Sequence, residues 1–143
     1  MAAERTAEVV WSGSLLEGAG TIERVGSGAL GPLDVTWASR SEESNGLTSP
    51  EELIAAAHAA CYSMALSSGL AKAGTPPDRL ETSVTVTFVP GTGITKSAIR
   101  VRGSVPGLEE TAFLEHAAAA KEGCPVSKAL AGVPEITLDA ALA

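Results

Sequence analysis

The N-terminal part of the chain alternates short apolar segments with turn residues. Val9, Val10 and Trp11 are good strand formers, and glycine-rich turns follow the apolar segments. The pattern predicts three short strands, over residues 6–13, 18–26 and 33–39. A polar loop over residues 41–47 then separates these strands from the rest of the chain.

A long helix is the clearest feature of the pattern. Ser49 suits the N-cap, Pro50 suits the first helical position, and Glu52 completes a Ser-x-x-Glu capping box. We predict that this helix continues to about Ala73, because the Gly-Thr-Pro-Pro segment that follows cannot extend it.

The C-terminal half mixes strand and helix patterns. Val84, Val86 and Phe88 stand at alternate positions, which is typical of a half-buried strand. The predicted elements are strands over 81–89, 95–105 and 135–141, a helix over 109–122 closed by Gly123 at its C′ position, and a short helix opened by Cys124 and Pro125. The order βββ-α-ββ-αα-β predicts a single α+β domain over residues 1–143 with a largely antiparallel sheet.

Composition and charge narrow the function classes. The 143 residues are 45% hydrophobic, and the formal charge is −7 with few, scattered basic residues, so nucleic acid and anionic membranes are poor partners. Glu4, Arg5 and Glu8 interrupt any apolar leader. The most apolar stretch, Ile54 to Leu66, is shorter than the roughly 20 residues of a membrane span. We therefore expect a cytoplasmic protein.

The two cysteines are the residues best suited to chemistry. In the cytoplasm a cysteine is more often free, catalytic or metal-bound than part of a structural disulfide. Cys61 lies in the middle of the long helix, where a buried cysteine that acts as a small hydrophobic residue is the commoner interpretation. Cys124 lies at a predicted helix N-terminus, which favours a thiolate. Together they suggest a nucleophile and a resolving thiol that condenses with its sulfenic acid.

A cysteine in the middle of a helix needs a nearby cation to lower its pKa. Arg40, where the third strand enters the polar loop, is the best candidate in the front half of the chain, although it could be a solvated loop charge. Such an arginine needs an orienting carboxylate. Glu51 is available for this because Glu52 already serves the cap, although Glu51 could simply complement the helix dipole.

The cysteines lie in two motifs, PEELIAAAHAACYSMAL over residues 50–66 and GCPVSKAL over residues 123–130. Both motifs resemble those of the OsmC subgroup of the OsmC/Ohr peroxidase family. Further similar segments are Gly93–Lys96, Val105–Gly107 and Ile136–Asp139, so the resemblance covers essentially the whole chain. Tyr62 stands where Phe is common in the family, which we expect to alter the polarity of the pocket. Residues 16–20 lack the arginine of the Ohr branch.

The resemblance implies an OsmC-like fold with a long central helix, in an intertwined homodimer. It implies a thiol-dependent peroxidase that reduces organic hydroperoxides, and hydrogen peroxide more weakly, with neither cofactor nor metal. Cys61 matches the peroxidatic position and Cys124 the resolving one. Arg40 and Glu51 match the activating arginine and its carboxylate. The implied reductant is a dithiol, with a dihydrolipoyl protein as one candidate.

The spacing of Glu51 and Cys61 bears on the dimer. About ten residues of helix place them roughly 15 Å apart and facing about 80° apart, too far for contact along one straight helix. Either the helix starts later, or Glu51 serves the cysteine of the partner across an antiparallel helix crossing near Ala56, where small residues permit close approach. We therefore expect a two-fold dimer in which both chains build each site.

Two other interpretations remain open. His58, Cys61, His116 and Cys124 could bind zinc, although no pair has the usual ligand spacing. For His58, a hydrogen-bonded position in the core or at an interface is a simpler interpretation than a role in setting the pKa of the thiol. For His116, helix packing or solvent exposure is the simplest interpretation. Alternatively, the protein is a non-enzymatic carrier that binds a small molecule in an apolar dimer pocket. A carrier would keep its binding after Cys61→Ser and would consume no peroxide.

Overall fold

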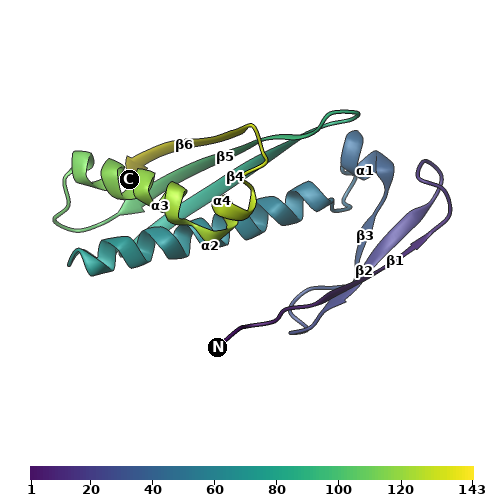
Figure 1. Cartoon of the computed structure of the whole chain (residues 1–143), viewed down its shortest axis with the longest axis horizontal. Coiled ribbons are helices and arrows are strands. Elements are labelled where there is room, and N and C mark those ends of the chain that lie inside the picture. Colours follow the sequence, from purple (N-terminus) through teal and green to yellow (C-terminus); the bar gives the residue numbers. More distant parts are fainter. The chain divides into compact units, whose positions relative to one another are not determined.

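A computed structural model describes residues 1–143 and divides them into two compact units, residues 1–53 and 54–143. Both units combine strands with helices, as the pattern predicted (Figure 1). The count of one domain over residues 1–143 stays a prediction.

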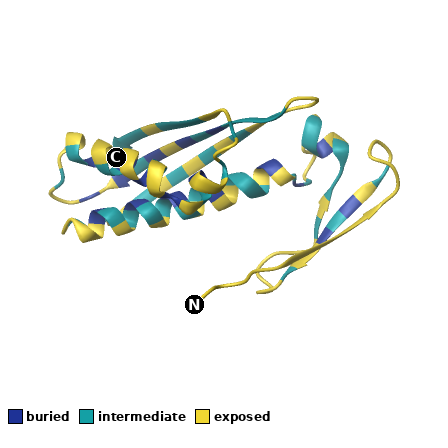
Figure 2. Ribbon diagram, viewed as in Figure 1, coloured by how far each residue is buried: buried dark blue, intermediate teal, exposed yellow.

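The first unit is built on a small antiparallel sheet. Strands β1 (Ala7–Ser12), β2 (Ala19–Val25) and β3 (Leu33–Val35) pair in chain order, and the short helix α1 (Trp37–Ser41) follows. Every residue of β1 is exposed, and Ile22 is the one buried hydrophobic residue of the unit (Figure 2). This sheet therefore has no apolar core of its own.

Helix α1 takes the place of the end of the predicted third strand, so the predicted strand over 33–39 is wrong beyond Val35. Thr36 is the N-cap: its side chain accepts the N–H of Ser39 at 3.0 Å, and the Ser39 hydroxyl accepts the N–H of Thr36 at 3.0 Å. These reciprocal bonds satisfy two backbone donors that a strand would have left to a neighbour. Arg40 consequently lies in a helix and not at a junction of strand and loop.

Helix α2 (Pro50–Lys72) is the long helix that the sequence predicted. The Ser49 hydroxyl accepts the N–H of Glu52 at 3.1 Å, but the Glu52 carboxylate accepts the hydroxyl of Thr48 at 2.9 Å. The predicted capping box is therefore formed only in its first half. By length and composition alone α2 could cross a membrane. Its fully buried side chains Tyr62, Leu66 and Leu70 instead mark the core helix of a folded unit.

The second unit holds a mixed sheet. Strands β4 (Arg79–Val89) and β5 (Gly93–Ser104) form an antiparallel hairpin, and β6 (Glu135–Leu142) lies parallel to β5. Helices α3 (Glu110–Gly123) and α4 (Pro125–Ala129) make the crossover that parallel pairing requires. The α+β class is confirmed, with β5 and β6 as the exception to antiparallel pairing. Gly123 is the last residue of α3 and not a left-handed C′ glycine, because the backbone turns at Cys124.

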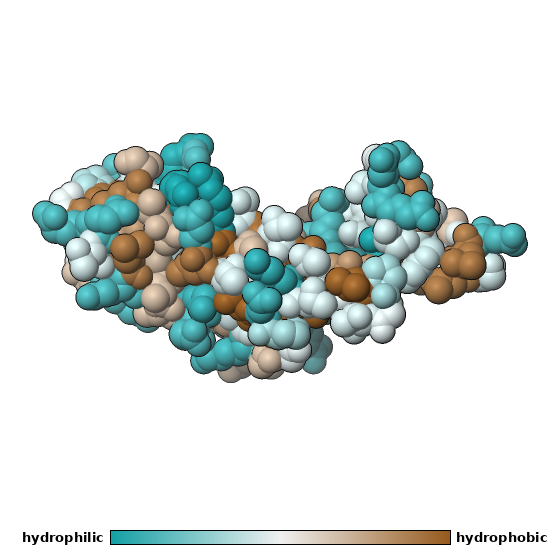
Figure 3. Space-filling model, turned by 90° about the horizontal axis from the view of Figure 1, so that it is seen from above, coloured by the Kyte–Doolittle hydropathy of each residue, from teal (hydrophilic) through white to brown (hydrophobic).

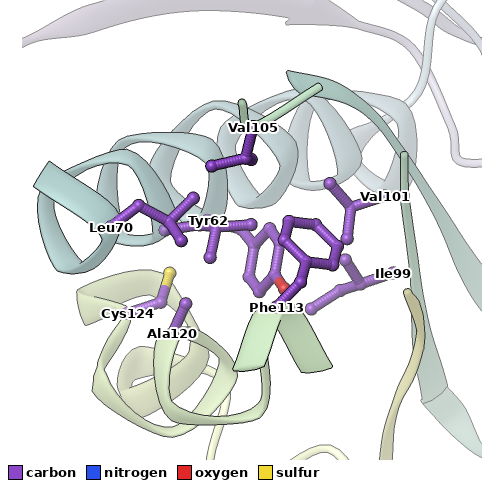
Figure 4. Packing of buried hydrophobic residues seen from close by; sticks show 9 residues of the cluster. Tyr62, Leu70, Ile99, Val101, Val105, Phe113, Ala120 and Cys124 are labelled. Carbon is purple, nitrogen blue, oxygen red and sulfur yellow. The ribbon is translucent and has the colours of Figure 1, made fainter. Parts of the chain in front are cut away.

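The hydrophobic core lies between α2, the sheet and α3 (Figure 4). Tyr62, Phe113 and Val101 are fully buried there, and burial of a side chain of this size contributes about 1.5–3 kcal/mol. Gly103 of β5 allows the close approach of Phe113, because a Cβ atom at this position would lie 2.7 Å from the ring. The core thereby fixes α2 and the end of α3, which carry the two cysteines.

Candidate active site

The structure brings the two cysteines together. Cys61 projects from α2 and is partly exposed, whereas Cys124 lies between α3 and α4 and is fully buried. The sulfur of Cys124 points into the core cluster (Figure 4), and the two free thiols lie close enough for each to change the acidity of the other. Two segments that are far apart in sequence thus form one dithiol pair.

The backbone on either side fixes the place of Cys124. Its N–H donates to the carbonyl of Ala120 at 2.9 Å, and its carbonyl accepts the N–H of Lys128 at 3.1 Å. It therefore ends α3 and caps α4, and Pro125 at the first position of α4 suits that junction. Its side chain makes no capping bond of standard geometry, yet the sulfur faces the N–H groups of Val126 and Ser127 and the Ser127 hydroxyl.

The two thiols differ in acidity. Burial acts to raise the pKa of Cys124, but the N–H groups of Ser127 and Val126, the Ser127 hydroxyl and the Cys61 thiol outweigh it and lower this pKa. Burial raises the pKa of Cys61; the Val126 N–H opposes this effect, and the neighbouring Cys124 raises the pKa further. Cys124 is therefore the more acidic thiol of the pair, and Cys61 is the less acidic one.

No positively charged group acts on the sulfur of Cys61. Its sulfur is acted on by burial, by Val126 and by Cys124, none of which supplies positive charge. A cation from elsewhere must therefore come to Cys61 before this sulfur can become the more acidic of the two.

Arg40 and Glu51 form a tight ion pair in the first unit. The Nε atom of Arg40 donates to Oε1 and Oε2 of Glu51 at 2.9 and 3.2 Å, and Nη2 donates to Oε1 at 2.8 Å. The Glu51 side chain is 7% exposed and that of Arg40 is 32% exposed. Such fork-shaped pairing gives the guanidinium a defined direction. The structure therefore pairs these two residues in the way expected of an arginine and a carboxylate that orients it.

Beside Arg40 lies an open pocket of about 390 Å³, which we call the tryptophan pocket. It is lined mostly by apolar side chains together with Arg40: Trp11, Leu15, Val35, Thr36, Trp37, Arg40 and Pro50. A pocket of this kind suits a small apolar molecule with one polar end.

His58 belongs to a buried network that the sequence did not reveal. Its Nδ1 lies 2.7 Å from the Ser97 hydroxyl and its Nε2 lies 2.8 Å from the Ser127 hydroxyl. His58 and Ser97 are fully buried and Ser127 is 7% exposed. Burial lowers the pKa of His58, so the ring is neutral near pH 7.

These bonds decide how His58 is interpreted. The core reading of His58 fits, because both ring nitrogens have a hydroxyl partner. His58 cannot join the cysteines as a zinc ligand without losing one of these bonds, and no group of three or more potential ligand side chains is placed to hold a metal ion. The only sign of this network in the sequence was spacing. His58 precedes Cys61 by three residues, about one helical turn, and Ser127 follows Cys124 by three residues.

Tyr62 is a core residue and does not line a pocket. It is fully buried, and its hydroxyl donates to the carbonyl of Ala117 in α3 at 3.0 Å. The expectation that a tyrosine here changes the polarity of a pocket is therefore wrong. The hydroxyl instead ties α2 to α3.

Comparison with known sequences gives a consistent result. The family model described as OsmC-like protein matches residues 43–139. Peroxiredoxin OsmC of Escherichia coli strain K12 is 40% identical over 142 aligned residues, which cover 97% of this chain and 96% of that relative. Peroxiredoxin OsmC of Shigella flexneri matches with the same identity and coverage.

Solved structures with the same fold come from several bacteria. The organic hydroperoxide resistance protein OhrB of Bacillus subtilis superposes with a TM-score of 0.64 at 27% identity, over 96% of this chain and 98% of that one. The organic hydroperoxide resistance protein OsmC of Legionella pneumophila gives a TM-score of 0.68 at 24% identity, over 95% of this chain and 96% of that one.

Proposed function

This chain belongs to the OsmC-like protein family, and on that premise we propose that it is a thiol-dependent peroxidase that reduces organic hydroperoxides, and hydrogen peroxide more weakly. The observation that carries the proposal is the pair of neighbouring free thiols, Cys61 and Cys124. Relatives named peroxiredoxin OsmC, 40% identical over nearly the whole chain, support the activity.

The first half-reaction oxidises Cys61. The shared proton moves from Cys61 to Cys124, and the Cys61 thiolate attacks the terminal oxygen of the hydroperoxide. The O–O bond breaks, Cys61 becomes a sulfenic acid, and the departing alkoxide takes the proton from Cys124 and leaves as an alcohol. This transfer returns Cys124 to the thiolate form.

The second half-reaction closes the disulfide. The Cys124 thiolate attacks the sulfur of the Cys61 sulfenic acid, the S–O bond breaks, and hydroxide leaves as water after taking a proton from solvent. Disulfide formation prevents further oxidation of Cys61. A dithiol reductant then restores both thiols, and a dihydrolipoyl group is the donor that we propose.

Arg40 is the proposed source of the positive charge that Cys61 lacks. The guanidinium would stabilise the Cys61 thiolate and the developing alkoxide, while Glu51 holds it in one orientation through the bonds of 2.8 and 2.9 Å. Helix spacing places Glu51 about 15 Å from Cys61 of the same chain, so we propose that the pair acts on the cysteine of a partner chain.

Exposed apolar surface supports a homodimer. Large apolar side chains are exposed in both units: Val9, Val10, Trp11, Leu15, Leu16, Leu30, Met64, Val89 and Leu114. Figure 3 shows hydrophobic surface, coloured brown, on one face of the molecule. Three of the exposed apolar residues, Val9, Val10 and Trp11, are consecutive residues of β1, so both faces of this strand carry exposed apolar side chains that a partner would shield from water. We propose that a second copy covers them, and that the protein works in the cytoplasm, where dithiol reductants keep its cysteines reduced.

The tryptophan pocket supports organic hydroperoxides as substrates. Apolar side chains would hold the organic group, and Arg40 would hold the peroxide oxygens. Hydrogen peroxide has no organic group, so it gains nothing from the apolar lining.

The experiment that tests this proposal is a steady-state assay with a dithiol reductant. The value of kcat/KM for cumene hydroperoxide should exceed that for hydrogen peroxide by about tenfold or more, since burial of an aromatic group contributes about 1.5–3 kcal/mol. Cys61→Ser should abolish turnover with both peroxides. Residual turnover in Cys61→Ser would contradict the mechanism, and binding of the organic compound without turnover in the wild type would favour a carrier.

A further inference from the structure

A buried chain of hydroxyl and imidazole groups leads to the resolving cysteine. Ser97 of β5, His58 of α2 and Ser127 of α4 are joined by contacts of 2.7 and 2.8 Å. Cys124 is the N-cap of α4 and Ser127 lies in its first turn, which places the Ser127 hydroxyl beside the Cys124 sulfur. These groups come from three elements that meet only in the folded second unit. The mechanism above uses none of them.

The direction of the hydrogen bonds follows from counting donors. The Ser97 hydroxyl is fully buried, and its contact with His58 is its one side-chain hydrogen bond. A buried hydroxyl hydrogen without an acceptor is costly, so Ser97 donates to Nδ1 of His58. If Nδ1 carried the proton instead, the hydrogen of Ser97 would have no acceptor.

This direction determines the next two bonds. A neutral imidazole carries one proton, so with Nδ1 as acceptor the proton lies on Nε2. Nε2–H then donates to the Ser127 hydroxyl oxygen at 2.8 Å. The hydrogen of the Ser127 hydroxyl is thereby turned away from His58 and is available to the sulfur of Cys124.

We infer that Ser97 and His58 are positioning residues that turn the hydroxyl of Ser127 toward Cys124, so that its O–H donates to the sulfur and keeps Cys124 in the thiolate form that resolves oxidised Cys61. The inference deepens the proposed function and rests on it for the role of Cys124. The opposite direction would have the opposite effect, because Ser127 would then accept from the Cys124 S–H and favour the thiol.

The surroundings of the network agree with this direction. Burial alone lowers the pKa of His58, and no charged group acts on it. The groups around the Cys124 sulfur are Cys61 of α2 and, in α4, Val126 and Ser127. Burial raises the pKa of the Tyr62 phenol, and the charge of Cys124 raises it further. None of these neighbours is a cation, so within one chain the acidity of Cys124 depends on hydrogen-bond donors.

The first test is the tautomer of His58 in the reduced wild-type protein. Long-range proton–nitrogen NMR of the imidazole should show a neutral ring with its proton on Nε2. A ring protonated on Nδ1 would overturn the inference, because Ser127 would then be turned toward His58. This measurement needs neither peroxide nor a variant, so it stands even if the protein proves not to be a peroxidase.

The second test titrates Cys124 in a Cys61→Ser background, which keeps a hydroxyl donor beside the sulfur and leaves one thiol. Thiolate absorbance should show that Ser127→Ala lowers the ionised fraction at a fixed pH by about tenfold, and that Ser97→Ala lowers it by a smaller factor. Ser97→Thr retains the hydroxyl and should retain the titration. An unchanged titration in Ser127→Ala, or equal effects of Ser97→Thr and Ser97→Ala, would overturn the inference.

The third test separates the inference from the proposed function. After one equivalent of cumene hydroperoxide, Ser127→Ala should form the Cys61 sulfenic acid at least as fast as the wild type, because a less acidic Cys124 leaves more Cys61 thiolate, but should close the disulfide about tenfold more slowly. Slowing of both steps together would indicate general damage and would count against the inference. If the wild type formed no sulfenic acid at all, the proposed function would fail, while the tautomer and the titration would still decide the inference.

Discussion

Arg40 holds the carboxylate of Glu51 with two nitrogens, Nε and Nη2, which lie 2.9 and 2.8 Å from the same oxygen. Glu51 is buried, so water solvates its carboxylate poorly and the charge depends on this partner. The last turn of α1 and the first turn of α2 are thereby joined by one partly buried ion pair. The pairing leaves the guanidinium with a fixed direction, which is what activation of a thiol requires.

Removal of the Arg40 guanidinium should slow peroxide attack. Arg40→Ala should raise the pKa of Cys61 and reduce the rate of sulfenic acid formation at neutral pH by about tenfold or more, because an opposite charge within a few ångströms favours the thiolate. Thiolate absorbance and stopped-flow oxidation measure the two effects. Arg24→Ala is the matched control, since Arg24 forms an exposed ion pair with Glu8. A Cys61 pKa that is unchanged in Arg40→Ala would require another cation.

Subunit exchange should show where Glu51 acts. Glu51→Ala should reduce activity less than Arg40→Ala, because it removes the orienting group and leaves the cation. If Glu51 serves the cysteine of a partner chain, a refolded heterodimer of Glu51→Ala and Cys61→Ser chains collects both defects in one site and leaves the other site intact. Its activity should exceed that of the two parent homodimers mixed without exchange. Equal activity would place Glu51 in the same chain as its cysteine, or outside the site.

Loss of the resolving thiol should leave the first oxidation intact. Cys124→Ser should still convert Cys61 to a sulfenic acid, but without a partner this should advance to sulfinic acid, with a mass gain of two oxygens. Mass spectrometry after successive equivalents of hydroperoxide follows both species. The wild type should instead show a Cys61–Cys124 disulfide after the first equivalent. Its absence would contradict the two-cysteine mechanism.

Acid should destabilise the second unit through His58. Burial holds the pKa of His58 in the folded protein below the value of about 6.5 expected when unfolded. The unfolded state therefore binds the proton first, and stability that is complete above pH 6.5 falls as the pH drops toward the folded pKa, by at most about 1.4 kcal/mol per pH unit. Urea unfolding at pH 7.5 and 5.5 measures this. His58→Gln, which does not titrate, should lose less stability over the same interval, and an equal loss would show that His58 is not the cause.

Local order along the chain was largely readable from the sequence. The alternation of Val84, Val86 and Phe88 placed β4, and Ser49 and Pro50 placed the start of α2, because side-chain period and end caps depend on near neighbours. Helix α1 was not predicted from the sequence, because its reciprocal cap uses Thr36 and Ser39 in place of the usual Ser-x-x-Glu pattern. The two cysteine motifs likewise identified both thiols, since each motif is a continuous segment.

Tertiary structure alone decided which side chains meet, in which direction the buried hydrogen bonds run, and which of the two thiols is more acidic. His58 is separated by 39 residues from Ser97 and by 69 residues from Ser127, and no periodicity links positions so far apart. The order of acidity of Cys61 and Cys124 also depends on contacts made across the core. A hydroxyl in water can turn to any partner, whereas a buried hydroxyl must give its hydrogen to the one acceptor that the fold provides. The direction of the hydrogen bonds around Cys124 is therefore a property of burial, and burial exists only in the folded chain.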